Sequence, residues 1–299
     1  MAKTNYIKTY VDFLAKHLQP RRKLRVVFDC SNGTTGAVIK ILRNLVSGKL
    51  EIFLINEKPD GRFPAHGPDP MAKDALNDLR QAVHGRKADL GAIFDADGDR
   101  VFFLDSRGRF VSGDITSALI SQRFKGPIVL DVRHGYLARE IIKADDKKVV
   151  NSRVGHYFVK KLMTQKKIRF GAEISGHYYF RFRDAVWDSG ILGAIEFINA
   201  AASLPVDLAI WIDEMPRYYC SGEINFKIDD KMTVLHGLEQ NYQKRADKIS
   251  RLDGLRMEFS DWWFSLRPSN TENLLRLNLE AKTRESFQKN LAKIKSLIH

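Results

Sequence analysis

Short apolar runs rich in β-branched residues alternate with helical stretches through the first two thirds of the sequence. The first unit leads from KLRVVFDC (residues 23–30) through AVIKILRNL (37–45) to LEIFLIN (50–56). A strand, a helix and a second strand in this order predict parallel strands joined by a crossover helix. The same alternation restarts with PIVLDV (127–132), so the sequence predicts two consecutive α/β units of similar strand–helix order.

After Tyr218 the pattern changes to alternating polar and apolar residues, which is typical of antiparallel strands. CSGEINFKI (220–228), GLRMEFSDWWFSLRPS (254–269) and LLRLNLEA (274–281) show it, with helical patterns between and after them. The predicted fold class is therefore α/β, with two consecutive α/β domains with mixed sheets followed by a smaller α+β C-terminal domain. We expect the domains at residues 1–112, 113–215 and 216–299.

The charge balance limits the classes of ligand that the chain can bind. It carries 49 Lys and Arg against 36 Asp and Glu, a net charge of +13. Nucleic-acid binders usually gather such an excess in one stripe, but here the basic residues are scattered. We expect no nucleic-acid partner. The excess fits a site for phosphorylated small molecules, and a solvated basic surface is the better explanation for most of the basic clusters.

No apolar run approaches the length of a membrane span, and the polar first helix does not fit a signal peptide. Cys30 and Cys220 are too isolated for a disulfide framework. We therefore expect a cytoplasmic protein without a membrane partner.

Three carboxylates alternate in DADGDR (95–100), directly after the apolar run LGAIF. An EF-hand does not fit, because its loop needs glycine at the sixth and glutamate at the twelfth position. Carboxylates beside a buried strand are costly unless a cation pairs with them. Mg²⁺ takes such oxygen ligands and keeps positions open for phosphate, and Arg100 matches phosphate geometry. A solvated acidic turn remains the alternative from these residues alone.

Two further stretches carry candidate binding groups. In GAEISGH (171–177), Glu173 and Ser175 suit the hydroxyls of a sugar, and His177 can move a proton near neutral pH. The alternative is a strand whose polar side faces water.

In RPSNT (267–271), a guanidinium, hydroxyls, an amide and backbone N–H groups suit a phosphate. The alternative there is an ordinary surface turn.

Together, the three motifs resemble those of the alpha-D-phosphohexomutase superfamily, in which a metal loop, a sugar loop and a phosphate loop occur in this order, one per domain. The resemblance covers essentially the whole chain. AEISGHYYFRFRDAVWDSG and RPSNTENLLRLNLEA are most similar to the phosphomannomutase/phosphoglucomutase branch. The resemblance implies an isomerase that interconverts hexose 1-phosphate and hexose 6-phosphate through a bisphosphate, with mannose or glucose phosphates as partners.

The resemblance also implies roles for individual residues. Asp95, Asp97 and Asp99 would bind Mg²⁺, and Arg100 and His177 would be catalytic. The implied substrate-binding residues are Arg133, His156, Glu173, Ser175, His177, Arg267, Ser269, Asn270 and Thr271. Two positions depart from the family pattern: Arg133 stands where many members have lysine, and Ala96 replaces a loop glycine.

The family's chemistry depends on a phosphoserine in a motif like TASHNP, and no such motif occurs in the 299 residues. We therefore expect little or no mutase activity from this chain alone. Three origins are open for the domain that bears the serine: a separate chain supplies it, it was cut away, or it was lost in evolution. The alternative is a non-catalytic remnant that binds sugar phosphates or a partner, although the retained acidic loop favours the enzyme lineage.

Overall fold

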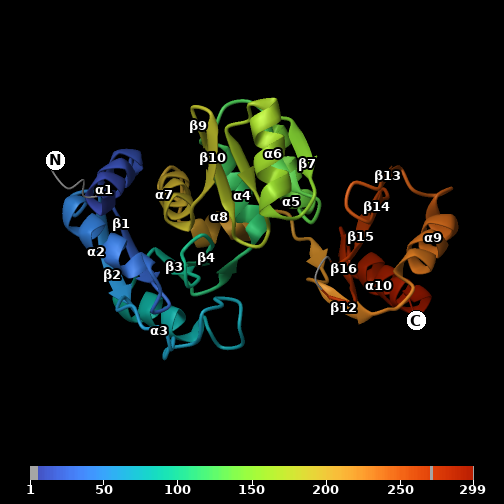
Figure 1. Ribbon diagram of the computed structural model, residues 1–299, viewed down its shortest axis with the longest axis horizontal. Coiled ribbons are helices and arrows are strands. Elements are labelled where there is room, and N and C mark those ends of the chain that lie inside the picture. The colour runs from blue at the N-terminus through green and yellow to red at the C-terminus, as the bar shows by residue number, and fades with distance from the viewer. Residues whose placement is uncertain (1–5, 270–271, 299) are drawn as a thin grey trace.

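The computed structural model describes residues 6–269 and 272–298. Within these ranges the chain forms three β-sheets, which follow one another along the long axis of the molecule (Figure 1). Helices accompany each sheet, and the third sheet is antiparallel throughout. This architecture confirms the predicted fold class, while the exact domain boundaries stay predictions.

The first sheet has the strand order β2-β1-β3-β4-β5. Its first three strands are parallel, and β4 and β5 are antiparallel additions. Its elements are α1 (Tyr6–His17), β1 (Leu24–Asp29), α2 (Thr35–Leu45), β2 (Leu50–Ile55), α3 (Asn77–Arg86), β3 (Leu90–Phe94), β4 (Val101–Asp105) and β5 (Phe110–Val111).

The second sheet, of order β7-β6-β8-β9-β10, repeats this topology strand for strand. Again the first strand lies between the next two and is parallel to both, and two antiparallel strands complete the sheet. The repeated order in the sequence therefore corresponds to a repeated topology. The elements are α4 (Gly113–Ser121), β6 (Ile128–Asp131), α5 (Tyr136–Ala144), β7 (Val149–Ser152), α6 (His156–Lys166), β8 (Phe170–Ala172), β9 (Tyr178–Phe182), β10 (Ala185–Asp188), α7 (Gly190–Ala201) and α8 (Leu208–Glu214).

The third sheet belongs to the C-terminal part. Its longest strand, β16, pairs with β15 on one side and with the short strands β11 and β12 on the other. A separate apolar core lies beneath it. The elements are β11 (Tyr219–Cys220), β12 (Ile224–Lys227), α9 (Lys231–Tyr242), β13 (Lys248–Ser250), β14 (Leu255–Glu258), β15 (Trp262–Pro268), β16 (Leu274–Ala281) and α10 (Arg284–Ile298).

The first two sheets share one continuous hydrophobic core, to which α1, α4 and α7 contribute. Every residue of α7 is buried, and its Phe197 stacks on Phe103 of β4 with ring centroids 4.1 Å apart. The sequence analysis did not identify this helix, because a helix that is apolar all round lacks the periodic pattern of a surface helix. Burial of α7 fixes the two α/β units against each other.

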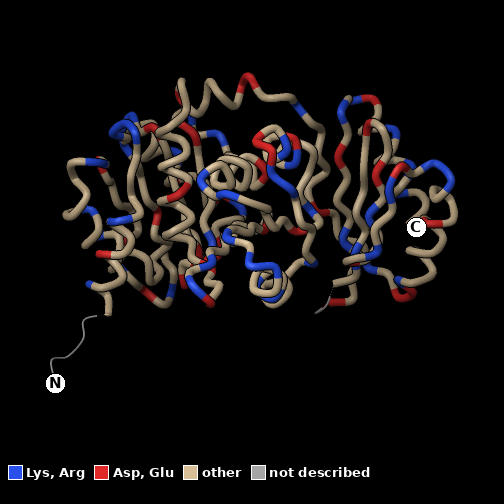
Figure 2. The backbone as a smooth tube through the Cα atoms, turned by 90° about the horizontal axis from the view of Figure 1, so that it is seen from above, with Lys and Arg blue, Asp and Glu red and all other residues tan. Residues whose placement is uncertain are grey.

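The positions of the charged residues along the folded backbone agree with the scattered charge seen in the sequence. Figure 2 shows Lys and Arg on every part of the chain, interspersed with Asp and Glu. Among the described residues, no helix combines the length and the apolar character needed to cross a membrane.

Replacing Phe197 by alanine tests the shared core. We expect Phe197→Ala to lower the free energy of unfolding by about 3–5 kcal/mol, because it removes a fully buried ring. Urea unfolding measures the change. The control Leu45→Ala removes a side chain that is 57% exposed and should cost less than about 0.5 kcal/mol. Equal effects of the two variants would contradict the shared core.

Candidate functional site

The acidic loop (95–100) and the loop 173–177 occupy equivalent positions in the two repeated sheets. Asp95 follows the third strand of the first sheet, and Glu173 follows the third strand of the second. Three residues later each loop turns at a glycine, Gly98 with φ 79° and Gly176 with φ 90°, a conformation that favours glycine. Asp99 and His177 come next in each loop, so they hold equivalent positions.

These two loops bond directly to each other. Arg100 and His177 form an isolated antiparallel bridge, and the Val101 N–H donates to the Gly176 carbonyl at 3.1 Å. The bridge brings Asp99 Oδ2 to 3.4 Å from His177 Nε2. The structure thus joins the predicted metal loop and the predicted sugar loop.

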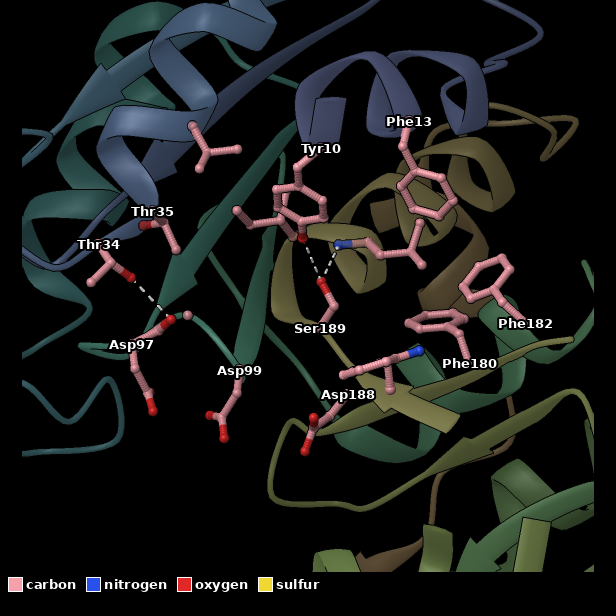
Figure 3. Close-up of a pocket in the computed structure, with 15 residues that line it drawn as sticks. Tyr10, Phe13, Thr34, Thr35, Asp97, Asp99, Phe180, Phe182, Asp188 and Ser189 are labelled. Carbon is pink, nitrogen blue, oxygen red and sulfur yellow. Dashed lines mark hydrogen bonds between the residues drawn. The ribbon is translucent and has the colours of Figure 1, made fainter. Parts of the chain in front are cut away.

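One oxygen each from Asp95, Asp97 and Asp99 lies within 4.8 Å of the other two. Asp95 is nearly buried and accepts the Gly98 and Arg100 N–H groups and, at 2.6 Å, Arg100 Nε. Asp97 is exposed, and in Figure 3 its carboxylate points the same way as that of Asp99. The cluster therefore presents oxygen ligands on one side of a fixed turn.

The backbone of the acidic loop is held from two sides. Thr34 donates its N–H to the Ala96 carbonyl and its hydroxyl to the Asp97 carbonyl. Gly190, at the start of α7, donates its N–H to the Gly98 carbonyl at 3.0 Å. A Cβ at Gly190 would lie 2.7 Å from that carbonyl oxygen, so only glycine allows this approach.

The electrostatics of the cluster suit a divalent cation. Burial raises the pKa of Asp95, although Arg100 opposes the shift. A hydrogen bond with His177 lowers the pKa of Asp99 to about 2. Neighbouring carboxylates repel one another when all are ionised, and a cation with a preference for oxygen ligands, such as Mg²⁺, relieves that repulsion. The residues present therefore fit a metal site of this kind.

Glu173 holds its own loop together. Its carboxylate is buried and accepts the Gly155 N–H at 2.7 Å and the Tyr179 hydroxyl at 2.5 Å. His177 Nδ1 lies 3.2 Å from Ser175 Oγ and 3.6 Å from Glu173 Oε2. Burial, reinforced by Glu173, raises the pKa of Tyr179 far above its ordinary value, so its hydroxyl stays a donor. Direct contact of Glu173 with a sugar stays a prediction.

Arg133 connects this loop to the end of β6. Its Nη2 lies 2.7 Å from Asp131 and 3.3 Å from Ser175 Oγ, and Asp131 also accepts the Ile174 N–H at 3.0 Å. Burial alone would raise the pKa of Asp131, but Arg133 and His134 outweigh it and hold that pKa well below its usual value. Asp131, which the sequence analysis missed, is therefore an ionised anchor for Arg133 and for the loop.

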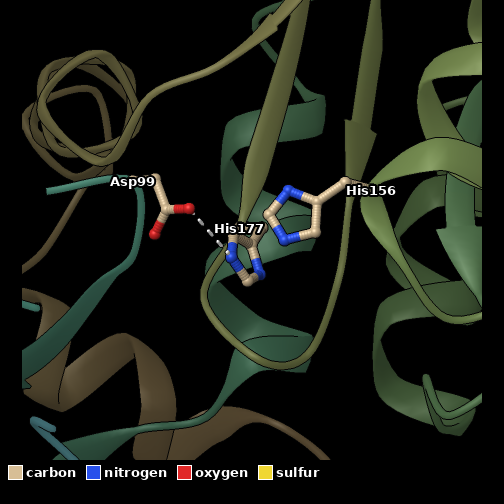
Figure 4. A group of neighbouring side chains, drawn as sticks. All are labelled: Asp99, His156 and His177. Atoms are coloured by element: carbon tan, nitrogen blue, oxygen red, sulfur yellow. Dashed lines mark ion pairs between the residues drawn. The ribbon is translucent and has the colours of Figure 1, made fainter. Parts of the chain in front are cut away.

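His156 is the first residue of α6, and its ring lies 4.3 Å from that of His177 (Figure 4). Its Nδ1 lies 2.8 Å from Asp188, which also binds Lys160 at 2.9 Å. His156, His177 and Asp99 each offer one atom within 4.8 Å of the other two. The structure thus brings His156 into the same site as the two loops.

In the third sheet, Arg267 of β15 stands opposite Arg276 of β16. Glu223 joins them, 3.0 Å from Arg267 Nη2 and 3.1 Å from Arg276 Nη1. Arg276 Nη2 also lies 3.3 Å from Ser269 Oγ. Sequence analysis missed Arg276, whose role becomes visible only in the strand register. Asn270 and Thr271 lie outside the described residues.

The third sheet's region contacts the second unit near the arginine pair. Burial would lower the pKa of Arg133, but Asp131, Glu173 and also Glu223 of the third sheet's region raise it. The Val154 N–H, two residues before His156, donates to Asp253 at 3.1 Å. Gly254, the residue after Asp253, lies against the Leu266 carbonyl and the backbone of Arg267. Arg267 is therefore close to the segment that carries Val154 and His156.

A cavity of about 560 Å³ lies beside the acidic loop, and Asp97, Gly98 and Asp99 form part of its lining (Figure 3). Aromatic side chains from α1 and the β9–β10 hairpin line it, and its described lining includes no Lys or Arg. A phosphate needs cationic partners, so the cavity is not suited to one. The aromatic residues are Tyr10, Phe13, Phe180, Phe182 and Trp187.

Comparison with known families covers all three parts of the chain. Residues 5–108 and 112–219 match the alpha/beta/alpha domains II and III of phosphoglucomutase/phosphomannomutase, and residues 223–296 match its C-terminal domain. The chain belongs to the phosphoglucomutase/phosphomannomutase family. This membership confirms the resemblance found from the three sequence motifs.

Phosphoglucomutase/phosphomannomutase relatives are similar over nearly the whole chain. A phosphomannomutase of Methanocaldococcus jannaschii is 36% identical over 99% of this chain and 66% of its own length. A phosphomannomutase of Escherichia coli K12 is 32% identical over 93% of the chain and 63% of its own length. The crystal structure of a family protein from Burkholderia thailandensis has a TM-score of 0.87 at 23% identity, over 97% of this chain and 63% of that one. The chain thus spans slightly less than two thirds of the length of these relatives.

Replacing Asp131 by asparagine tests the anchor of the second loop. We expect Asp131→Asn to lower the free energy of unfolding at pH 7 by about 3 kcal/mol, because Arg133 would keep a buried charge without its partner. Urea unfolding measures it, with Asp146→Asn on an exposed turn as the control, which should change less than about 0.5 kcal/mol.

The effect of this substitution should also depend on pH. The pKa of Asp131 is lower in the folded protein than in the unfolded chain, where it is about 3.9. Ionised Asp131 therefore stabilises the folded state fully above about pH 3.9, and this stabilisation is lost as the pH falls through the pKa of the folded state. The difference between wild type and variant should therefore shrink below about pH 4. A difference independent of pH would show that Asp131 does not act through its charge.

Proposed function

We propose that this chain binds a hexose phosphate between the acidic loop and the Arg267 region, as part of a phosphohexomutase of the phosphomannomutase/phosphoglucomutase type. The reaction interconverts the 1-phosphate and 6-phosphate of mannose or glucose through a bisphosphate. One observation carries the proposal: the Arg100–His177 bridge joins the carboxylate cluster to the loop that also contacts Arg133. A carboxylate cluster, an imidazole and an arginine side by side suit a phosphorylated sugar.

At the reacting end, Asp95, Asp97 and Asp99 would hold Mg²⁺, which supplies positive charge for the phosphoryl group in transfer. Asp95 orients the Arg100 guanidinium by accepting from Nε. Asp69 lies 3.7 Å from Nη1, and phosphate oxygens would bind the outer N–H groups in its place. His177 Nε2 faces Asp99, where a sugar hydroxyl would give up its proton. On the other side of the imidazole ring, Ser175 and Glu173 lie next to His177 Nδ1.

At the far end, Arg267, Ser269 and Arg276 would grip the phosphate that does not react. Glu223 holds both guanidiniums in one place, and Ser269 Oγ lies beside Arg276. We include Asn270 and Thr271 in this clamp on the family resemblance. Arg133 and His156 complete the substrate site between the two ends.

Binding of glucose 6-phosphate in the presence of Mg²⁺ tests the clamp. We expect Arg267→Ala to weaken the affinity measured by calorimetry about 10- to 100-fold, since a hydrogen bond to a charged group contributes roughly 1.5–3 kcal/mol. Arg284→Ala is the matched control, because it removes an exposed arginine of the same part of the chain. Circular dichroism checks that both variants are folded. Equal affinities in the two variants would remove Arg267 from the site.

The proposal assigns no nucleophile to this chain, because its sequence contains no Ser-His-Asn-Pro motif. The same observation favours a second candidate function, binding of sugar phosphates without turnover. The comparisons offer no support for a separate chain that supplies the serine, so the proposal includes none.

A turnover assay separates the two candidates. Purified chain with mannose 1-phosphate, Mg²⁺ and mannose 1,6-bisphosphate should form no mannose 6-phosphate above the enzyme-free blank. Phosphoryl transfer needs an acceptor and donor group that the described site lacks. The phosphomannomutase of Escherichia coli serves as the positive control. Turnover comparable to that control would show that the chain carries its own phosphoryl-accepting group.

A further inference from the structure

We propose that Asp99, His156 and His177 form a second metal site, selective for a transition ion such as Zn²⁺. It is distinct from the cluster of three aspartates, whose ligands are all oxygens. Imidazole nitrogens suit zinc, copper, iron and nickel, whereas carboxylates and water suit magnesium. Two histidines and one carboxylate are a common set of three protein ligands for a zinc ion that keeps a position open.

The distances fit such an ion. Asp99 Oδ2 and His177 Nε2 are 3.4 Å apart, and a tetrahedral zinc holds its ligand atoms about 3.3 Å from one another. One atom of His156 lies within 4.8 Å of an atom of each partner, and its ring stands at 66° to that of His177. Figure 4 shows His177 between the Asp99 carboxylate and the ring of His156.

Both histidines are oriented through their second nitrogen. Asp188 lies 2.8 Å from His156 Nδ1 and is itself held by Lys160. His177 Nδ1 is next to Ser175 and Glu173. In a metal-binding histidine, the ring nitrogen that does not bind the metal usually donates its N–H to a carboxylate or another oxygen. This hydrogen bond fixes the ring and makes the ligand nitrogen more basic. The partners here leave Nε2 of both rings for an ion.

The supporting backbone is fixed before any ion arrives. Glu173 accepts the N–H of Gly155, directly before His156, and the bridge to Arg100 fixes His177. His156 has 47% of its side chain exposed, so an ion can enter and water can fill the fourth position. The three ligands therefore come from separate turns that are already bonded to one another.

Asp99 belongs to both sets of ligands. An ion bound to the histidines would withdraw Asp99 from the aspartate cluster and occupy the face of His177 to which the proposed substrate binds. Zn²⁺ and Mg²⁺ should therefore compete at this residue, with Zn²⁺ favoured by its nitrogen ligands. The site would make the chain sensitive to transition metals.

Metal binding by the untagged chain tests the proposal. Zn²⁺ affinity is measured by competition with a chromophoric chelator, and Mn²⁺ affinity by electron paramagnetic resonance as a probe of the aspartate cluster. We expect one tight Zn²⁺ per chain. His156→Ala should weaken Zn²⁺ binding by at least about 100-fold, since loss of a mere partner of a ligand already costs about 10- to 100-fold, and should leave Mn²⁺ binding unchanged. Asp97→Asn should weaken Mn²⁺ binding and leave Zn²⁺ binding unchanged.

His236→Ala, which removes an exposed histidine of α9, is the matched control and should change neither affinity. Co²⁺ adds a spectroscopic check, because its visible absorption reports nitrogen ligands and should be lost in His156→Ala. Zn²⁺ binding that depends on Asp97 and not on His156 would overturn the proposal and place zinc in the aspartate cluster. Sugar-phosphate binding through Arg267 is measured separately, so the proposed function can stand if the zinc site fails.

Discussion

The antiparallel bridge between Arg100 and His177 is the contact on which the candidate site depends. Each residue lies in the turn that follows the third strand of its own sheet, so the bridge joins two sheets turn to turn. It places the Asp99 carboxylate 3.4 Å from an imidazole nitrogen. Without this contact, the acidic loop and the second loop would be unrelated polar turns on separate sheets. The bridge makes them two walls of one site.

The shared core holds this bridge in place. The buried helix α7 packs Phe197 on Phe103 of the first sheet, while its first residue, Gly190, bonds to the acidic loop. Moving the two loops apart would therefore also open an apolar interior, which costs far more than breaking two hydrogen bonds. The site is rigid because the packing behind it is extensive, and the polar groups in front need only fine adjustment.

The sequence predicted the sheets, most helices and the polar loops, because periodicity and residue type are local properties. It could not predict that the loops of the two repeats touch, since that depends on packing between distant strands. Arg276 is part of the candidate clamp only through its register opposite Arg267, which alternation alone does not give. Glu173 shows the same limit. Its place in the motif is evident, but only the structure shows that Gly155 and Tyr179 occupy its oxygens.

The two repeats use one turn geometry for different chemistry. In the first sheet the turn carries carboxylates at Asp95 and Asp99, and in the second it carries His177 in the position equivalent to Asp99. Facing the turns toward each other therefore pairs an oxygen-rich surface with a nitrogen-bearing one. The imidazole lowers the pKa of Asp99 to about 2, so that the repulsion from Asp95 does not protonate it. A single turn of either kind would offer only one of these properties, and the duplicated topology supplies both.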